Sequence, residues 1–322
     1  MPLLRRSLIV ALQAAFLVAV IWFAYGRIAD QWAGAPTTRL DIRWSWIAAA
    51  TALVLATYAL LIEVWVRHLR AWRVRLRFSQ AARLWFVANL GRYIPGKVWG
   101  LGTMAVMARQ LNVAPVAALG SSVTVMAIGM ISGFAVVVAT GGRVIDAVLA
   151  RWAIDPPRGS VAAAALIALA AVAATPLVLP RLVHAAARLG RRQVAVPDLS
   201  APAVWLVAAG TALSWVLYGV AFFWFARGVI GVAGGGVAGY IAVYTASYLL
   251  GLLALIPGGI GVREGGLVLG LEALGLATAP DALLLAVTSR IWLTILEIVP
   301  GALLLIVGTR RSTTESEAPA QP

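Results

Sequence analysis

The sequence contains no cysteine, only two histidines and few charged residues. Without cysteine there can be no disulfide, thiolate metal site or cysteine nucleophile, and the redox compartment stays undetermined. Charged residues are 12% of the 322 residues and hydrophobic residues 62%, whereas a soluble domain has about 25% charged residues. So little polar surface cannot cover a water-soluble globule of this size. We therefore expect a protein whose solvent is a lipid bilayer.

Acidic residues are also scarce: 12 Asp and Glu stand against 26 Lys and Arg, which gives a formal net charge of +14. The basic residues form no stripe with interleaved aromatics, as a nucleic-acid-binding protein would have. They lie in short segments between long apolar runs, a pattern that marks cytoplasmic loops. This pattern predicts cytoplasmic N- and C-termini, with loops 27–43 and 143–158 outside, in a multi-pass protein of a bacterial-type inner membrane.

Six apolar runs are long enough to cross a bilayer, which takes about 20 helical residues. They are 8–25, 46–66, 116–140, 161–179, 204–225 and 282–307.

Two further apolar regions are broken in the middle by Pro-Gly. The region 82–107 is interrupted at Pro95 and Gly96, and the region 237–275 at Pro257, Gly258 and Gly259. If either region crossed the membrane once, the basic loops after it would fall on the wrong side. We therefore expect both to be re-entrant helical hairpins.

The two broken regions also form an internal repeat, because "GRYIPGKVWG" (91–100) aligns with "LLALIPGGIG" (252–261). The halves, 1–145 and 158–308, each hold two spans, a hairpin and a third span. Since three is an odd number of crossings, the second half should be inverted relative to the first. The sequence thus predicts an all-α polytopic fold, with one membrane domain over 1–308 and a disordered cytoplasmic tail over 309–322.

A helix break inside a membrane leaves peptide groups that only protein or a water-lined cavity can satisfy. The half-helix that follows begins with free amides and partial positive charge, which suit an anion such as phosphate. Several cationic residues lie near the two breaks. The predicted substrate-binding residues are Arg92, Tyr93, Pro95, Gly96, Lys97, Pro257, Gly258, Gly259, Gly261, Arg263, Glu264 and Arg290.

Structural roles are open for some of these residues. Arg92 can extend to the cytoplasmic interface, and Glu264 either pairs with Arg290 or couples a proton. Three glycine pairs at a spacing of four favour close helix packing over a ligand site: Gly129 and Gly133, Gly261 and Gly265, and Gly266 and Gly270. His68 and His184 are expected in basic loops without a second ligand, so we expect no metal site.

Enzyme motifs are absent: no phosphate-binding loop, zinc-protease motif or nucleophile elbow occurs. We expect no catalytic activity and no cofactor.

The segments "GRYIPGKVWG" and "IPGGIGVREGG" (256–266), with the stretch to Arg290, resemble the family named for the transmembrane region of lysylphosphatidylglycerol synthases. The resemblance implies an α-helical membrane protein that moves a lipid between leaflets, an aminoacylated phosphatidylglycerol in its best-known members. The soluble aminoacyl-transferase domain is lacking here, so lipid synthesis is not expected. Relatives without that domain are linked by analogy to polyprenyl-phosphate-linked sugars.

The leading hypothesis is a flippase-like transporter of an anionic, phosphate-headed lipid, such as a polyprenyl-phosphate or aminoacylated lipid. Two alternatives remain: an ion-coupled transporter of a small solute, and a non-transporting membrane partner of a glycosyltransferase that uses lipid-linked sugars. The expected partners are an anionic membrane lipid and envelope-biosynthesis enzymes, with no nucleic acid.

Overall fold

The structure is a computed structural model, and it describes residues 42–90, 99–142, 159–189, 200–231, 234–254 and 259–316. Within these ranges every regular element is a helix, which confirms the all-α fold class. The α-helices are α2 (Trp44–Leu69), α3 (Phe78–Leu90), α4 (Trp99–Gln110), α5 (Pro115–Thr140), α7 (Ser160–Leu189), α8 (Ala201–Val229), α9 (Val237–Leu253), α10 (Val262–Ala273) and α11 (Ala279–Ser316), and a 3₁₀ turn, η1 (Arg70–Trp72), follows α2.

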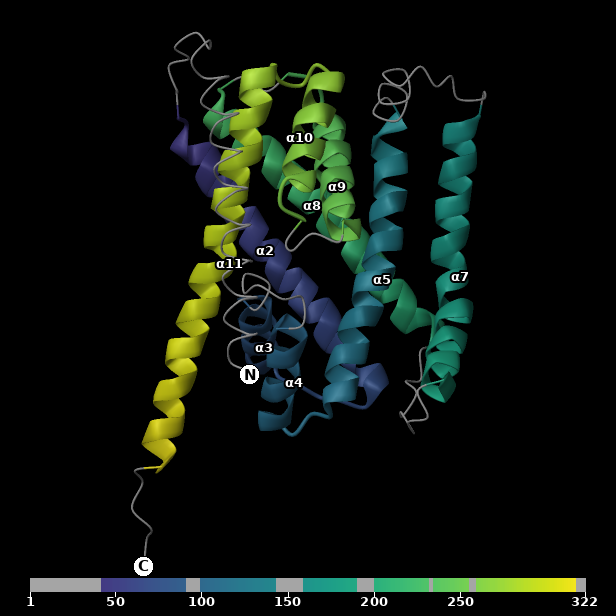
Figure 1. Ribbon diagram of the computed structural model, residues 1–322, viewed down its shortest axis with the longest axis vertical. Helices are drawn as coiled ribbons and strands as arrows, with labels where there is room; N and C mark the ends of the chain where they lie inside the picture. Colours follow the sequence, from purple (N-terminus) through teal and green to yellow (C-terminus); the bar gives the residue numbers. More distant parts are fainter. Residues whose placement is uncertain are drawn as a thin grey trace, which may run out of the picture.

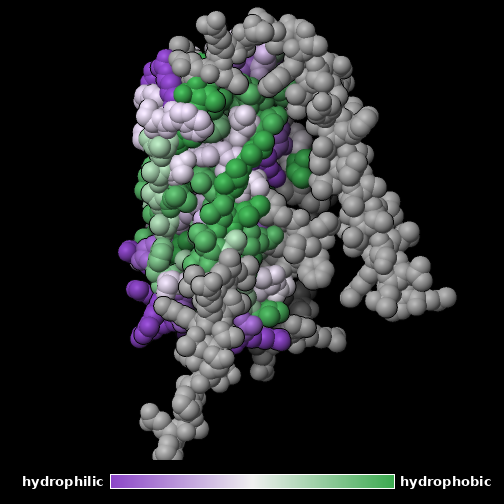
Figure 2. Space-filling model, turned by 90° about the vertical axis from the view of Figure 1, so that its left-hand side faces the viewer, coloured by the Kyte–Doolittle hydropathy of each residue, from purple (hydrophilic) through white to green (hydrophobic). Residues whose placement is uncertain are grey.

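Four helices, α2, α5, α8 and α11, are long and apolar enough to cross a membrane. They coincide with the predicted runs 46–66, 116–140, 204–225 and 282–307, and α7 covers the predicted run 161–179. The predicted span 8–25 lies outside the described residues. Figure 2 shows mostly hydrophobic side chains over the middle of one face, with hydrophilic residues gathered toward its ends. This distribution fits a multi-pass membrane protein.

Each Pro-Gly-broken region forms a pair of short helices that pack against each other. The pair α3 and α4 lies at the lower end of the molecule in Figure 1, beside the end of α2 and the start of α5. The pair α9 and α10 lies at the upper end, beside the end of α8 and the start of α11. The breaks themselves, 91–98 and 255–258, lie outside the described residues. The two pairs thus occupy opposite ends of the molecule.

Helix α8 is central, because it packs against α2, α5, α9, α7 and α11. Aromatic contacts join these helices. Phe225 of α8 stacks on Trp292 of α11 with ring centroids 4.4 Å apart, and the Trp292 Nε1–H donates to Thr51 Oγ1 of α2 at 2.9 Å. The hydroxyl of Ser132 on α5 bonds that of Thr211 on α8 at 2.8 Å. Stacking and paired polar groups therefore hold the bundle around α8.

Small residues let the helices approach closely where they cross, as is common in membrane bundles. A Cβ atom at Gly133 would lie 2.7 Å from Trp215 Nε1, and the Trp215 Nε1–H donates to the Gly129 carbonyl at 2.8 Å. These contacts confirm the packing interpretation of Gly129 and Gly133. At Gly219 of α8, a Cβ atom would overlap the backbone of Ile241 on α9.

Two features differ from expectation. Helix α11 continues past residue 308 to Ser316, although the sequence predicts disorder from residue 309. Extending an existing helix adds one hydrogen bond per residue, and no Gly or Pro interrupts residues 309–316.

His68 lies in the last turn of α2, with a side chain only 1% exposed, and not in a loop. Its Nε2 accepts a hydrogen bond from Trp72 Nε1 at 3.3 Å, so packing accounts for this histidine.

The contact at Gly219 predicts that Gly219→Ala destabilises the protein by about 1–3 kcal/mol, because the new methyl group must push α8 and α9 apart. Gly102→Ala is the matched control, since nothing lies within 4 Å of a Cβ atom there. Thermal unfolding in detergent should show a lower Tm for Gly219→Ala alone. Equal Tm values for the two variants would contradict the packing at this crossing.

Candidate functional site

The candidate site begins at the turn that leads into α10. Gly259 and Gly261 have φ angles of +63° and +85°, which only glycine adopts without strain. A Cβ atom at Gly259 would lie 2.7 Å from the carbonyl oxygen of Gly251 on α9. Gly259 therefore allows α9 and the turn to touch backbone to backbone. Gly261 and Gly265 face open space with nothing within 4 Å of a Cβ atom, so the close packing predicted for this pair is wrong.

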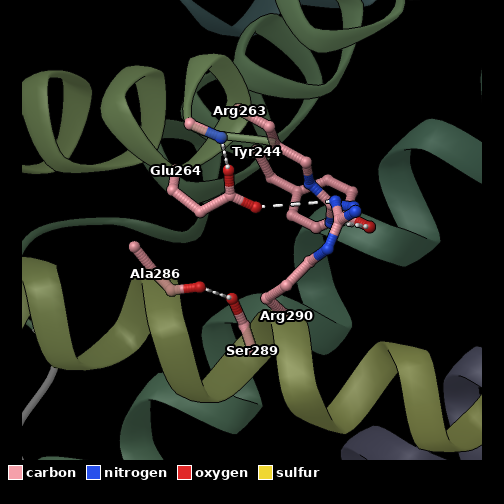
Figure 3. A network of polar contacts seen from close by, with 7 residues as sticks. Tyr244, Arg263, Glu264, Ala286, Ser289 and Arg290 are labelled. Carbon is pink, nitrogen blue, oxygen red and sulfur yellow. Dashed lines mark hydrogen bonds and ion pairs between the residues drawn. The ribbon is translucent and has the colours of Figure 1, made fainter. Parts of the chain in front are cut away.

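Glu264 stabilises the start of α10. Its Oε2 accepts a hydrogen bond from the Gly261 N–H at 2.7 Å, so the carboxylate satisfies a peptide group that the helix leaves without a partner. A negative charge in the first turn also offsets the positive end of the helix dipole. Glu264 thus has a fixed position within the turn (Figure 3).

Arg263 is a buried cation next to this cap, with a side chain 8% exposed. Its Nη2 donates to the Tyr244 hydroxyl at 3.2 Å. Its guanidinium carbon lies 4.6 Å from the centroid of the Tyr248 ring and 5.3 Å from that of Tyr244. Such cation–π contacts partly replace the water that a charged group loses on burial. The two tyrosines of α9 therefore hold the guanidinium in place.

Arg290 approaches from α11. Its Nη1 lies 3.5 Å from Glu264 Oε1, and the side chains of Arg290 and Glu264 are 24% and 20% exposed. This ion pair confirms that Glu264 pairs with Arg290, which was one of two roles predicted for it. The other role, proton coupling, stays a prediction. The carboxylates of Glu264 and Glu297 both interact electrostatically with Arg263. Arg263, Glu264 and Arg290 therefore come together where α10 packs against α9 and α11 (Figure 3).

The structure brings together the predicted site residues Gly259, Gly261, Arg263, Glu264 and Arg290. The other predicted site residues lie outside the described ranges: Arg92, Tyr93, Pro95, Gly96, Lys97, Pro257 and Gly258. The meeting of the two hairpins around one ligand therefore stays a prediction.

Tyr244 and Tyr248, which contact Arg263, are functional candidates that the sequence alone did not single out. Tyr240, Tyr244 and Tyr248 recur every four residues, so they share one face of α9. Tyr244 also stacks on Tyr218 of α8 with ring centroids 6.0 Å apart. A tyrosine at each turn of an otherwise apolar helix could have marked this face of α9 in the sequence. Tyr244 and Tyr218 thus connect Arg263 with α8, the central helix of the bundle.

Among the described residues, no group of three or more His, Cys, Asp or Glu could hold a metal ion.

Residues 8–301 match the family described as the lysylphosphatidylglycerol synthase TM region. The chain belongs to this family. No curated protein matches the chain significantly. Membership in the lysylphosphatidylglycerol synthase transmembrane family, together with the long apolar helices, supports an integral membrane protein with a lipid-related function. In this member the charged cluster lies on an interrupted helix pair and on the last long helix.

The geometry at the start of α10 predicts that Gly261→Ala lowers the free energy of unfolding by about 1–2 kcal/mol, because an L-residue is strained at positive φ. Gly265→Ala is the control, since both positions face open space and only Gly261 has a positive φ. Unfolding followed by tryptophan fluorescence in detergent should separate the two variants. A Gly261→Ala variant as stable as Gly265→Ala would argue against this turn.

Proposed function

We propose that the protein is a flippase-like transporter that moves a lipid with an anionic, phosphate-bearing headgroup between the two leaflets of its membrane. The observation that carries the proposal is Arg263, a buried cation on a helix pair inside an apolar bundle, with Arg290 beside it. Charged residues are costly within a membrane and usually serve a ligand or a transport path. Family membership supports a lipid as that ligand.

The chemistry of the two arginines favours phosphate. A guanidinium presents several N–H groups in a plane and can bind two phosphate oxygens at once. Arg263 uses Nη2 on Tyr244, which leaves further N–H donors on the same group. Open space beside Gly261 and Gly265 gives a headgroup room to approach the backbone at the start of α10.

Transport between leaflets would use an inverted repeat, which the course of the chain supports (Figure 1). Helix α2 runs downward, the α3–α4 pair lies at the lower end, and α5 runs upward. Helix α8 runs upward, the α9–α10 pair lies at the upper end, and α11 runs downward. The packing is also reciprocal, since α3 packs against α11 and α9 packs against α5. Paired broken helices in inverted repeats are typical of secondary transporters, in which one half rocks against the other.

We further propose that the lower end in Figure 1 faces the cytoplasm of a bacterial-type cell and that both helix pairs are re-entrant. The end of α2, the start of α8 and the end of α11 all lie at that end. Five arginines exposed at the end of α2 and in the segment after it favour a cytoplasmic location. They are Arg67, Arg70, Arg73, Arg75 and Arg77. The α9–α10 pair then enters the membrane from the outer side. The proposal includes no catalytic step by this chain.

The test is transport of a fluorescent phosphatidylglycerol in liposomes that contain the purified protein, with dithionite quenching to measure the fraction in each leaflet. Arg263→Gln should reduce the rate at least about tenfold, the scale expected for a lost charge-assisted contact. Arg263→Lys keeps the charge but lacks the planar fork, so an intermediate rate is expected. Arg75→Gln, an exposed position away from α10, should leave the rate unchanged.

A folded Arg263→Gln variant with the wild-type rate would contradict the site. Equal wild-type rates for phosphatidylglycerol and phosphatidylcholine would contradict the preference for an anionic headgroup. If the wild-type protein moves no lipid, the transport proposal is wrong.

A further inference from the structure

We propose that Arg227 binds the phosphate of a membrane phospholipid where the end of α8 meets the start of α2, and that this lipid is held as part of the structure. The ligand class is a phosphodiester lipid, whatever its headgroup. The site is separate from Arg263 and requires no transport, so the inference goes beyond the proposed function.

Arg227 lies in the last turn of α8, where α8 packs closely against α2. A Cβ atom at Gly228 would lie 2.6 Å from Ile47 Cγ1 on α2, and the Arg43 N–H donates to the Gly228 carbonyl at 2.9 Å. The end of α8 is therefore fixed to the start of α2, and Arg227 lies at their contact.

Two aromatic rings hold the guanidinium of Arg227. Its Cζ atom lies 5.0 Å from the centroid of the Trp46 ring on α2 and 5.5 Å from that of Phe223 on α8. Both distances are typical of cation–π contacts. The N–H groups of a guanidinium lie in its own plane, so rings over its face leave them available. The rings thus fix the position of a planar fork of donors.

These two rings cannot accept the hydrogen bonds of the guanidinium. Phenylalanine has no polar side-chain atom, and the tryptophan nitrogen is only a donor. Among the described residues, no ion pair or hydrogen bond engages the Arg227 guanidinium. Arg263 differs, because one of its rings belongs to Tyr244, whose hydroxyl accepts from Nη2. The donors of Arg227 therefore need an acceptor from outside the bundle.

The surroundings of Arg227 mark the level of the lipid headgroups. Helix α2 begins and α8 ends at the same end of the molecule, and both are long and apolar enough to cross a membrane (Figure 1). Trp44, the first residue of α2, is 71% exposed, and Trp46 contacts Trp224 with ring centroids 6.4 Å apart. Tryptophan gathers at the interface between hydrocarbon and water. The acceptor at that level is a lipid phosphate, which a guanidinium can bind through two oxygens.

A phosphate at this position would hold both helices. It binds Arg227 of α8, whose guanidinium lies over Trp46 of α2, so the lipid stabilises the contact between them. The Arg227 side chain is partly exposed, so a lipid can reach it while the bundle stays closed. Phosphatidylcholine and phosphatidylglycerol carry the same phosphodiester, so both should bind. The proposed site at Arg263, in contrast, prefers an anionic headgroup.

The test uses delipidated protein in a maltoside detergent, which carries no phosphate, and measures the rise of Tm with added dihexanoyl phosphatidylcholine. The wild type should show a saturable rise, whereas dihexanoylglycerol, which lacks the phosphate, should give none. Arg227→Gln should weaken the apparent affinity at least about tenfold, the scale of a lost charge-assisted contact. Arg227→Lys keeps the charge without the planar fork, so its affinity should be intermediate.

Two further variants separate this site from the rest of the molecule. Arg109→Gln removes an exposed cation at the other end and should bind phosphatidylcholine like the wild type. Arg263→Gln should also keep this binding, because the two sites are independent. Neither result depends on whether the protein moves lipid.

Wild-type affinity for phosphatidylcholine in a folded Arg227→Gln variant would overturn the inference. A lower Tm of this variant without lipid, followed by the same rise on addition of lipid, would show a packing role only and would also overturn it. An equal rise with inorganic phosphate alone would identify a site for a free anion and contradict the assignment to a lipid.

Discussion

A bilayer offers no water to the peptide groups of a chain within it, so each break in a helix must be satisfied by the protein itself. The chain breaks two apolar regions, and at the start of α10 the solution is visible. Gly261 allows the turn, and the Glu264 carboxylate accepts the exposed amide. The residue that satisfies the backbone is therefore also the anion that faces Arg290. One side chain thus serves both the start of α10 and the ion pair with α11.

The position of the buried Arg263 also depends on helix packing. A guanidinium placed at this depth needs electron-rich neighbours, and the tyrosine face of α9 supplies them. Gly251 and Gly266 bring α9 and α10 close enough for that contact, since a Cβ atom at either would press on the opposite helix. The packing of two short helices thus decides where the positive charge lies. The same packing thus fixes both the approach of the two helices and the position of the cation.

Much of the fold could be predicted because hydropathy and length mark spanning helices directly. The runs that became α2, α5, α8 and α11 stand out by composition alone. The breaks were visible as Pro-Gly, since proline lacks an amide and glycine tolerates positive φ. The Glu264–Arg290 pair was one of two alternatives, because two opposite charges in apolar surroundings favour each other. The inverted repeat was inferred from the aligned Pro-Gly breaks and the count of crossings, and it stays a prediction.

What could not be predicted depends on contacts between segments far apart in the sequence. Tyr244 and Tyr248 became partners of Arg263 only because α10 folds back on α9. The burial of His68 depends on how the end of α2 packs against its neighbours, which a local sequence pattern does not reveal. The length of α11 beyond residue 308 reflects helix propagation into a polar segment, where hydropathy carries no signal.

Trp292 has a consequence for the speed of events at the site. It lies two residues beyond Arg290 on α11, stacked on Phe225 and bonded to Thr51, so the backbone of this part of α11 is fixed to both α8 and α2. A shift of this part of α11 therefore involves α8 and α2 as well, so it is a collective motion of helices. Collective helix motions take microseconds to milliseconds. A rearrangement of the bundle at this level therefore falls in that slower range.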